Sequence, residues 1–342
     1  MPVTMKDVAA RAGVTPTVVS RVLHNKATAI RVSEATSERV RQAAIDLGYR
    51  YNAVGRMLRE QQTKTIGILH GAGFGRPRFQ GGSRYFAALM DGIVDGAFDN
   101  GYSLTLCPQL YGGDPGTAMS DGRFDGLVWY STNTTEEHRK LLGQCGVPVA
   151  LIHTPSAHIE GRTSSVMCDN DQGIGLGVDH LVKFGHRRIA FAYEEEDKFG
   201  EVALRLAAFR RHMQRHGLDV DPLDFIDVRL DRQGIRDYYR AGIRHTAVIG
   251  VNDGVAASFI HLAPEYQVSI PEDFSVVGFD STAYCLESRP QLTSIRQPLE
   301  EMGRSAVNLL VQSIRGDAPA RPDLVIPCGL DIRGSTTLSR IR

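Results

Sequence analysis

Short apolar segments alternate with amphipathic ones between Thr65 and Asp280, and this alternation constrains the fold more than any other feature of the chain. The apolar segments read TIGILH, SLTLC, GLVWY and VPVALIH in a first series, and RIAFAY, DFIDV, TAVIGV and FSVVGFD in a second. Helical patterns separate them, at 85–99, 135–145, 170–184, 203–216 and from 253 onward. Strands alternating with helices form parallel sheets covered by helices, so the pattern predicts an α/β core in two halves.

Two such halves predict a ligand-binding cleft. Ligands of parallel sheets bind beyond the carboxyl ends of the strands, and two facing lobes enclose the site. Polar and aromatic side chains that follow the predicted strands are therefore candidates for ligand contact, namely His70, Phe74, His153, Glu194 to Glu196, Asn252, Asp253 and Asp280. Trp129 and Tyr130 end a strand, where they either stack on a ligand or belong to the core. The acidic run at 194–197 is expected to be a solvated loop at the mouth of the cleft, and recognition of a cationic ligand is the alternative.

Charge is distributed unevenly along the chain. Lysine plus arginine and aspartate plus glutamate both number 39, yet the first 60 residues hold ten basic and only five acidic side chains. A basic segment joined to a mildly acidic remainder indicates contact with phosphate groups. A solvated charged surface is the alternative interpretation.

This basic segment carries the pattern of three short helices. Thr4 and Asp7 form a capping-box start, and Gly13 ends the first helix. Pro16 begins the second helix behind Thr15, a good N-cap residue. A third helix runs from the cap Ser33 to Leu47. Two short helices joined by a tight turn, with a third to complete a small core, predict a helix-turn-helix.

The polar face of the second helix is the candidate base-reading surface. In a helix-turn-helix this element lies in the major groove, where arginine donates two hydrogen bonds to guanine. Arg21 is therefore predicted to contact a base, with a phosphate contact as the alternative. The other candidates for DNA contact in this segment are Thr4, Thr15, Pro16, Thr17, Ser20, Lys26 and Arg31.

The motifs TMKDVAARAGV, VVSRVL, NAVGRMLR and TIGIL, in this order, resemble the lactose/galactose repressor (LacI/GalR) family of transcription regulators. The resemblance extends over practically the whole chain from Thr4 onward. It implies a helix-turn-helix domain at 1–50, a hinge helix and linker at 51–63, and a two-lobed periplasmic-binding-protein-like core for effector binding and dimerisation at 64–342. The expected lobes are 64–165 with 295–325, and 166–294 with 326–342.

The resemblance also implies roles for single residues. Asn52, Arg56 and Leu58 belong to the hinge helix, and Leu58 matches the leucine that enters the minor groove and kinks the duplex. Tyr51 and Gly55 depart from the family pattern, in which proline and alanine are usual. In the core, RLAAF matches the segment whose arginine, here Arg205, grips the effector, and VVGFD matches the segment whose aspartate is Asp280. His153 and Glu201 are further candidates, at positions where aspartate and small polar residues are common.

The function implied is that of a homodimeric repressor that binds a roughly palindromic double-stranded DNA operator and releases or tightens it when a carbohydrate-like molecule binds the cleft. No pattern of catalytic residues, metal ligands or cofactor loops is present in the sequence, so no cofactor and no metal are expected. A sugar-modifying enzyme and a transport binding protein are the alternatives that use the same cleft. The start of the sequence lacks the apolar core of a signal peptide, and no apolar run spans a membrane, so a cytoplasmic location away from the membrane is expected.

Overall fold

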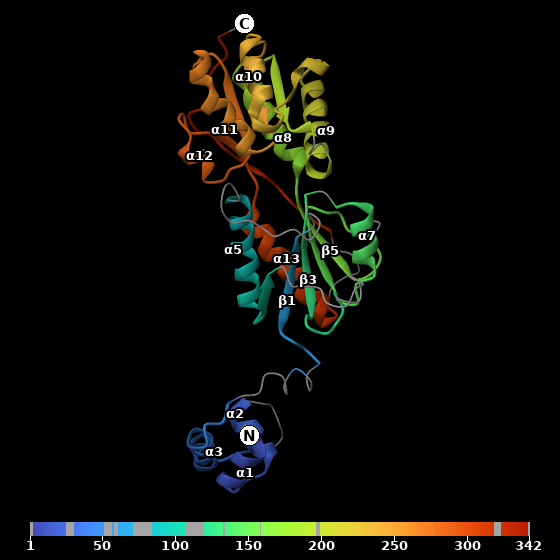
Figure 1. The fold of residues 1–342 in the computed structure, drawn as a ribbon, viewed down its shortest axis with the longest axis vertical. Helices are drawn as coiled ribbons and strands as arrows, with labels where there is room; N and C mark the ends of the chain where they lie inside the picture. The colour runs from blue at the N-terminus through green and yellow to red at the C-terminus, as the bar shows by residue number, and fades with distance from the viewer. Residues whose placement is uncertain are drawn as a thin grey trace. The chain divides into compact units, whose positions relative to one another are not determined.

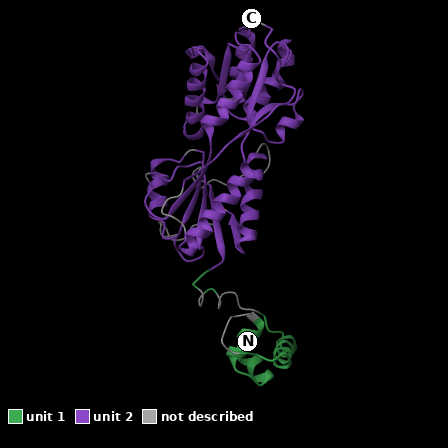
Figure 2. Ribbon diagram, turned by 180° about the vertical axis from the view of Figure 1, so that it is seen from behind, with its two compact units in different colours: residues 1–62 green, residues 63–342 purple. Residues whose placement is uncertain are grey.

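The computed structural model describes residues 3–24, 31–50, 57, 61–70, 84–106, 119–132, 134–157, 159–195, 199–317 and 323–340. The chain divides into two compact units, Met1–Gln62 and Thr63–Arg342 (Figure 2). Among the described residues, no helix combines the length and the apolar character needed to cross a membrane.

Three short helices make up the first unit: α1 (Met5–Ala12), α2 (Pro16–His24) and α3 (Glu34–Asp46). Their shared core consists of small and β-branched side chains, Val8, Ala9, Ala12, Val19, Val40, Ala43 and Ala44. The predicted ends are confirmed, because Thr4 and Asp7 form a capping box, Ser33 caps α3, and Gly13 follows α1 with a left-handed φ of 67°. The first unit is the predicted three-helix module.

The first sheet of the second unit is entirely parallel, in the order β11-β5-β4-β3-β1-β2. Side chains alternate between its two faces, as a strand period of two requires. Ile68, Val128 and Ile152 contribute to the main core, whereas Leu69, Trp129 and Leu151 belong to a separate cluster on the other face. The strands are β1 (Thr65–His70), β2 (Ser103–Leu106), β3 (Gly126–Tyr130), β4 (Val149–Ile152), β5 (Thr163–Cys168) and β11 (Asp323–Ile326).

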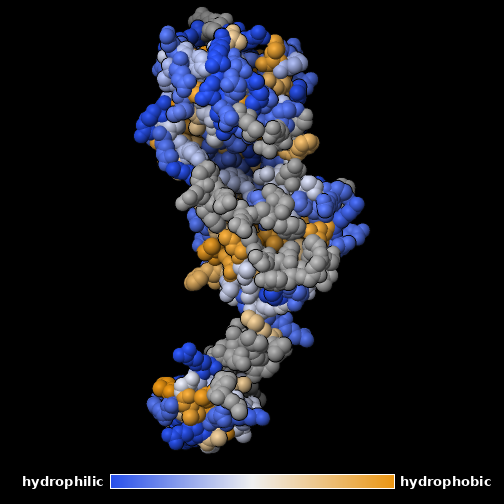
Figure 3. All heavy atoms as spheres, in the orientation of Figure 1, coloured by the Kyte–Doolittle hydropathy of each residue, from blue (hydrophilic) through white to orange (hydrophobic). Residues whose placement is uncertain are grey.

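Helices α5 (Arg84–Asp99) and α13 (Leu299–Arg315) pack closely against each other beside this sheet, with α7 (Glu136–Gly143) elsewhere on the lobe (Figure 1). Glycines permit the close approach of the two backbones. A Cβ atom at Gly92 would lie 1.9 Å from the carbonyl oxygen of Glu300, and one at Gly303 would lie 2.3 Å from that of Leu89. α5 also exposes Val94 and Phe98, by 48% and 84%, and Figure 3 shows apolar side chains at the surface of this lobe near α5.

The second sheet has the order β12-β10-β9-β8-β6-β7 and is parallel except for the pairing of β10 with β12. Its strands are β6 (Ile189–Tyr193), β7 (Phe225–Asp227), β8 (Ala247–Gly250), β9 (Ser275–Asp280), β10 (Thr293–Arg296) and β12 (Gly329–Asp331). Its helices are α8 (Asn170–Lys183), α9 (Gly200–Arg215), α10 (Gln233–Arg240), α11 (Asp253–Leu262) and α12 (Tyr284–Glu287). Short 3-10 turns occupy Pro222–Asp224, Leu230–Arg232 and Ala263–Tyr266.

The chain passes between the two sheets at three places, from β5 to α8, from β10 to α13 and from β11 to β12 (Figure 1). Each sheet with its helices forms one lobe, so α13 and β11 complete the first lobe after the second has been traversed. The predicted α/β core with parallel sheets is confirmed. The apolar pattern of the sequence does not predict strand β5, because its residues Thr163, Ser164 and Ser165 are buried but carry hydroxyl groups, which are more typical of loops.

Candidate functional site

The exposed start of α2 is the candidate DNA-reading surface of the first unit. The carbonyl oxygen of Thr15 accepts from the amides of Val18 and Val19, at 3.0 and 3.2 Å, so the helix opens at Pro16 as predicted. Val19 is fully buried against α1 and α3, which fixes the rotation of the helix. Thr15, Pro16 and Thr17 consequently face solvent, while Ser20 and Arg21 are half-buried. This face carries exposed hydroxyl groups, with the half-buried side chain of Arg21 beside them.

Thr4 and Arg31 differ in how freely they can bind phosphate. The Thr4 hydroxyl donates to the Asp7 carboxylate at 2.7 Å and the Asp7 amide donates back to it, so its first role is to cap α1. The hydrogen bonds that the hydroxyl and the amide of Thr4 donate to the carboxylate hold the pKa of Asp7 below its usual value. Arg31 is exposed just before α3. Lys26, Asn52, Arg56 and Leu58, with the hinge departures Tyr51 and Gly55, lie outside the described residues.

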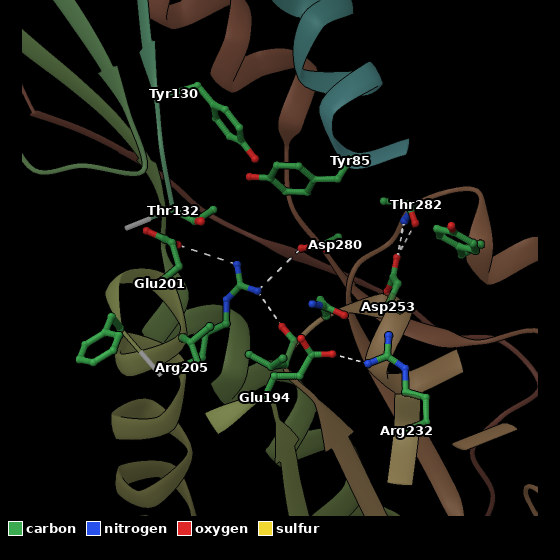
Figure 4. A pocket seen from close by; sticks show the side chains of 16 residues that line it. Tyr85, Tyr130, Thr132, Glu194, Glu201, Arg205, Arg232, Asp253, Asp280 and Thr282 are labelled. Atoms are coloured by element: carbon green, nitrogen blue, oxygen red, sulfur yellow. Dashed lines mark hydrogen bonds and ion pairs between the residues drawn. The ribbon is translucent and has the colours of Figure 1, made fainter. Parts of the chain in front are cut away.

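A cavity of about 470 Å³ lies between the two lobes of the second unit, at the carboxyl ends of the strands. The first lobe contributes Tyr85 from α5, Tyr130 from β3 and Thr132. The second lobe contributes Glu194, Phe199, Glu201, Val202, Arg205, Arg232, Val251, Asn252, Asp253, Gly254, Asp280, Thr282 and Tyr284. Figure 4 shows the two tyrosines opposite the Arg205 guanidinium and the Asp280 carboxyl, with Glu201 and Asp253 toward opposite ends.

Arg205 is the buried cation of this wall. Its Nε donates to Asn170 Oδ1 at 2.9 Å, its Nη1 donates to the carbonyl oxygen of Val251 at 2.7 Å, and its guanidinium lies 3.7 Å from the centre of the Phe279 ring. Two carboxyl groups lie near it, with Glu201 Oε2 and Asp280 Oδ1 each 3.8 Å away. Stacking and hydrogen bonds therefore fix the Arg205 guanidinium as a donor group at the cavity.

Asp280 ends β9 with a φ of 115°, a backbone conformation that non-glycine residues rarely adopt. Its Oδ1 accepts from Gln297 Nε2 at 2.6 Å. Burial raises the pKa of Asp280 to about 8; Arg205 opposes the rise, while Asp253 and Glu201 add to it. At neutral pH this carboxyl therefore holds a proton and can donate as well as accept.

Asp253 and Asn252 organise the neighbouring corner. The carboxylate of Asp253 accepts from the amide and hydroxyl of Thr282, at 2.6 and 2.8 Å, and from the Ser294 hydroxyl at 2.5 Å. Asn252 Oδ1 caps α11 by accepting from the amide of Val255 at 2.8 Å. Burial raises the pKa of Asp253, and the hydrogen bonds from Ser294 and Thr282 oppose the rise. These contacts fix the strand-end loops on which the cavity depends.

The amino-terminal region and the core each match a known protein family. Residues 4–52 match the description "Bacterial regulatory proteins, lacI family", and residues 178–336 match "Periplasmic binding protein-like domain". The ribose operon repressor of Escherichia coli (strain K12) is 30% identical over 322 residues, which are 91% of this chain and 93% of that protein. The chain belongs to the lacI family. As a member of this family it is a DNA-binding transcription regulator.

Solved structures of the lacI family extend the likeness to the whole architecture. A crystal structure of the lac repressor dimer bound to operator and the anti-inducer ONPF is 26% identical, covers 98% of this chain and 100% of its own, and has a TM-score of 0.77. The complex of the transcriptional regulator CelR with cellobiose is 26% identical, covers 97% of this chain and 99% of its own, and has a TM-score of 0.68.

Four predicted effector residues of this lacI-family chain, Glu201, Arg205, Asn252 and Asp280, line the cavity together. His153 does not line it: its side chain is buried behind the wall, with Nδ1 3.6 Å from Glu201 Oε2 and Nε2 in contact with the Tyr85 hydroxyl. Its left-handed φ of 63° accompanies this placement. Phe74 lies outside the described residues.

Other expectations are corrected by the arrangement. Arg205 and Asp280 both belong to the second lobe, where Nη1 and Oδ1 lie 3.8 Å apart. Trp129 is a core residue that donates to Thr134 at 3.1 Å, whereas Tyr130 lines the cavity. Glu194 is ion-paired with Arg232 at the wall and is not merely a solvated loop residue.

Sequence reasoning missed the contributions of Tyr85, Thr132, Thr282 and Tyr284. Thr132 and Thr282 lie two residues beyond the ends of β3 and β9, so extending the strand-end rule by two positions would have found them. Tyr85 lies at the start of a helix, where no strand-based rule applies.

Proposed function

We propose that this lacI-family chain is a homodimeric repressor whose affinity for a roughly palindromic operator is set by a carbohydrate-like effector in the inter-lobe cavity. Ligand and operator favour different arrangements of the lobes, and each changes the affinity for the other by the same factor. The names of the ribose operon repressor and of the CelR–cellobiose complex support a sugar as the ligand class. The cavity then acts as a sensor and not as a catalytic centre.

The observation that carries the ligand class is the pairing of a fixed guanidinium with a buried carboxyl group across from two tyrosine rings. Arg205 offers donors, and Asp280 offers both a donor and an acceptor to ring hydroxyls. Tyr85 and Tyr130 supply apolar ring surface for the C–H faces of a sugar (Figure 4). A ligand with alternating hydroxyl groups and C–H faces matches this wall.

For DNA, we assign base reading to the exposed face of α2, with Arg21 as the principal base contact. Thr15 precedes the helix, and Pro16, Thr17 and Ser20 lie along it. We assign Thr4 and Arg31 to phosphates. The assignments of Lys26, Asn52, Arg56 and Leu58 rest on the sequence resemblance. The operator-bound lac repressor dimer supports pairing of two chains on one site.

Selection of binding sites from a random duplex library tests the proposal. The most enriched sequence is expected to be roughly palindromic. Fluorescence anisotropy then measures the Kd of the protein for this duplex, and at least one sugar of a panel is expected to change that Kd. Arg205→Lys keeps the charge but loses the planar fork, so the sugar response is expected to disappear while operator binding without ligand remains. Absence of any enriched sequence would contradict the proposal.

A further inference from the structure

The wall of the inter-lobe cavity contains more acidic than basic groups. Among the described residues that line it, four carboxyl groups face two guanidinium groups: Glu194, Glu201, Asp253 and Asp280 against Arg205 and Arg232. Because the Asp280 carboxyl holds a proton at neutral pH, three carboxylates and two guanidinium groups are charged, and one negative charge is in excess.

Both arginines of the wall are already paired with its carboxyl groups. Arg232 is ion-paired with Glu194, and both side chains are about one-third exposed. Arg205 is shared between Glu201 and Asp280. In the described part of the chain, the Asp253 carboxylate is held by hydroxyl and amide donors rather than by a cation.

Glu201 brings an unsatisfied acceptor to the cavity. The residue is 3% exposed, and its Oε2 accepts from Asn170 Nδ2 at 2.6 Å. Its Oε1 is buried and has no hydrogen-bond partner among the described residues. A buried carboxylate oxygen without a donor is unfavourable, so this atom marks a place for a donor from a ligand. Figure 4 shows the Glu201 carboxyl beside Thr132, at one end of the cavity.

From these observations, and resting on the proposed function of this cavity as the effector site, we propose that the effector is an amino sugar or a similar polyol whose ammonium group donates to Glu201. A charge-assisted hydrogen bond to a buried carboxylate is about twice as strong as a neutral one. The same acidic wall selects against sugar phosphates and sugar acids, because it places like charges in a water-poor space.

The proton on Asp280 gives this binding mode a distinct signature. The charged and titratable groups around Asp280 come from several elements: Arg205 and Glu201 from α9, Asp253 from α11, Tyr85 from α5 and Tyr130 from β3. Burial, together with the neighbouring carboxylates, raises the pKa of Asp280 to about 8. A bound cation lowers this pKa, so at pH 7 an amine is expected to release up to one proton on binding, whereas a neutral sugar releases none.

Calorimetric titration of the full chain tests the proposal with matched ligands. The glucose, galactose and mannose series each supply the 2-amino sugar, the parent sugar, the N-acetyl derivative and the 6-phosphate. In at least one series the amine is expected to bind ten-fold or more tightly than its parent. Titrations at pH 7 in phosphate and in Tris, whose ionisation enthalpies differ, are expected to report proton release for the amine alone.

Glu201→Gln removes the charge at nearly constant shape and is expected to abolish the preference for the amine, whereas Glu265→Gln, at an exposed position, is expected to retain it. Equal or tighter binding of the parent or N-acetyl sugar, or no binding of any amine, would overturn the proposal. The proton count on the unmodified protein decides the matter even if the variant fails to fold. A neutral sugar that changes operator affinity would leave the proposed function standing without the amine, and a bound amine that leaves operator affinity unchanged would count against the function alone.

Discussion

Replacing Asp280 with asparagine is expected to make the protein progressively more stable than the wild type as the pH rises from 5.5 to 7.5. The folded state binds a proton at Asp280 up to a pKa of about 8, whereas the unfolded chain loses this proton near the ordinary aspartate pKa of 3.8. Because the unfolded state binds fewer protons in this interval, the stability of the wild type falls as the pH rises. Asparagine imitates the protonated carboxyl and does not titrate.

The magnitude follows from that difference in bound protons. One proton costs about 1.4 kcal/mol of unfolding free energy per pH unit, so the gap between variant and wild type is expected to widen by about 2.5 kcal/mol over the two units. Urea denaturation of the ligand-free proteins at pH 5.5, 6.5 and 7.5 measures this gap.

Asp237→Asn is the matched control, because hydrogen bonds from Arg229 and Gln233 hold the pKa of the exposed Asp237 below its usual value. Asp237 loses its proton below this pH range, so the difference in unfolding free energy between Asp237→Asn and the wild type is expected to stay constant. A gap for Asp280→Asn that is equally constant, or that narrows with rising pH, would refute the assignment of a buried protonated carboxyl.

Three further substitutions test other parts of the structure. Arg21→Ala is expected to reduce discrimination between operator and mutated operators, each good bidentate base contact being worth about 1–3 kcal/mol; unchanged discrimination in competition binding would assign Arg21 to phosphate. Gly92→Ala is expected to destabilise the protein by about 2–3 kcal/mol in urea denaturation, because the new Cβ would collide with the carbonyl group of Glu300. Gly143→Ala is the control: the nearest atom to its Cβ would be 3.6 Å away, so the change in stability is expected to stay within about 0.5 kcal/mol. Phe98→Asp is expected to weaken self-association in sedimentation velocity, because a carboxylate replaces an apolar ring that is 84% exposed. An unchanged dimer would place the interface elsewhere.

Periodicity and end signals were sufficient to predict the helices of the first unit. Thr4, Gly13 and Ser33 act on backbone groups within a few residues of themselves, so their effect is local and readable. The apolar strands were predictable for the same reason. Strand β5 was not, because Ser164 and Ser165 gain their burial from neighbouring strands that only the tertiary fold supplies.

The cavity was predictable only in part. Arg205 and Asp280 were found through the resemblance and the strand-end rule, and both face the ligand space. The same rule failed for His153, because it gives the position of a residue at the sheet edge and not the direction of its side chain. Tyr85 could not be found, since its place in the wall depends on how the first lobe closes over the second.

The three passages of the chain between the lobes have a consequence for synthesis on the ribosome. The first lobe receives α13 and β11 from residues 299–326, after every helix and strand of the second lobe except β12 has been made. The helix-turn-helix core, built within 46 residues of the start, can close much earlier, because domains fold as units from the amino terminus. A nascent chain therefore carries a finished DNA-reading module for a time before its sensor exists, and control by effector cannot begin until residues 299–331 have been made.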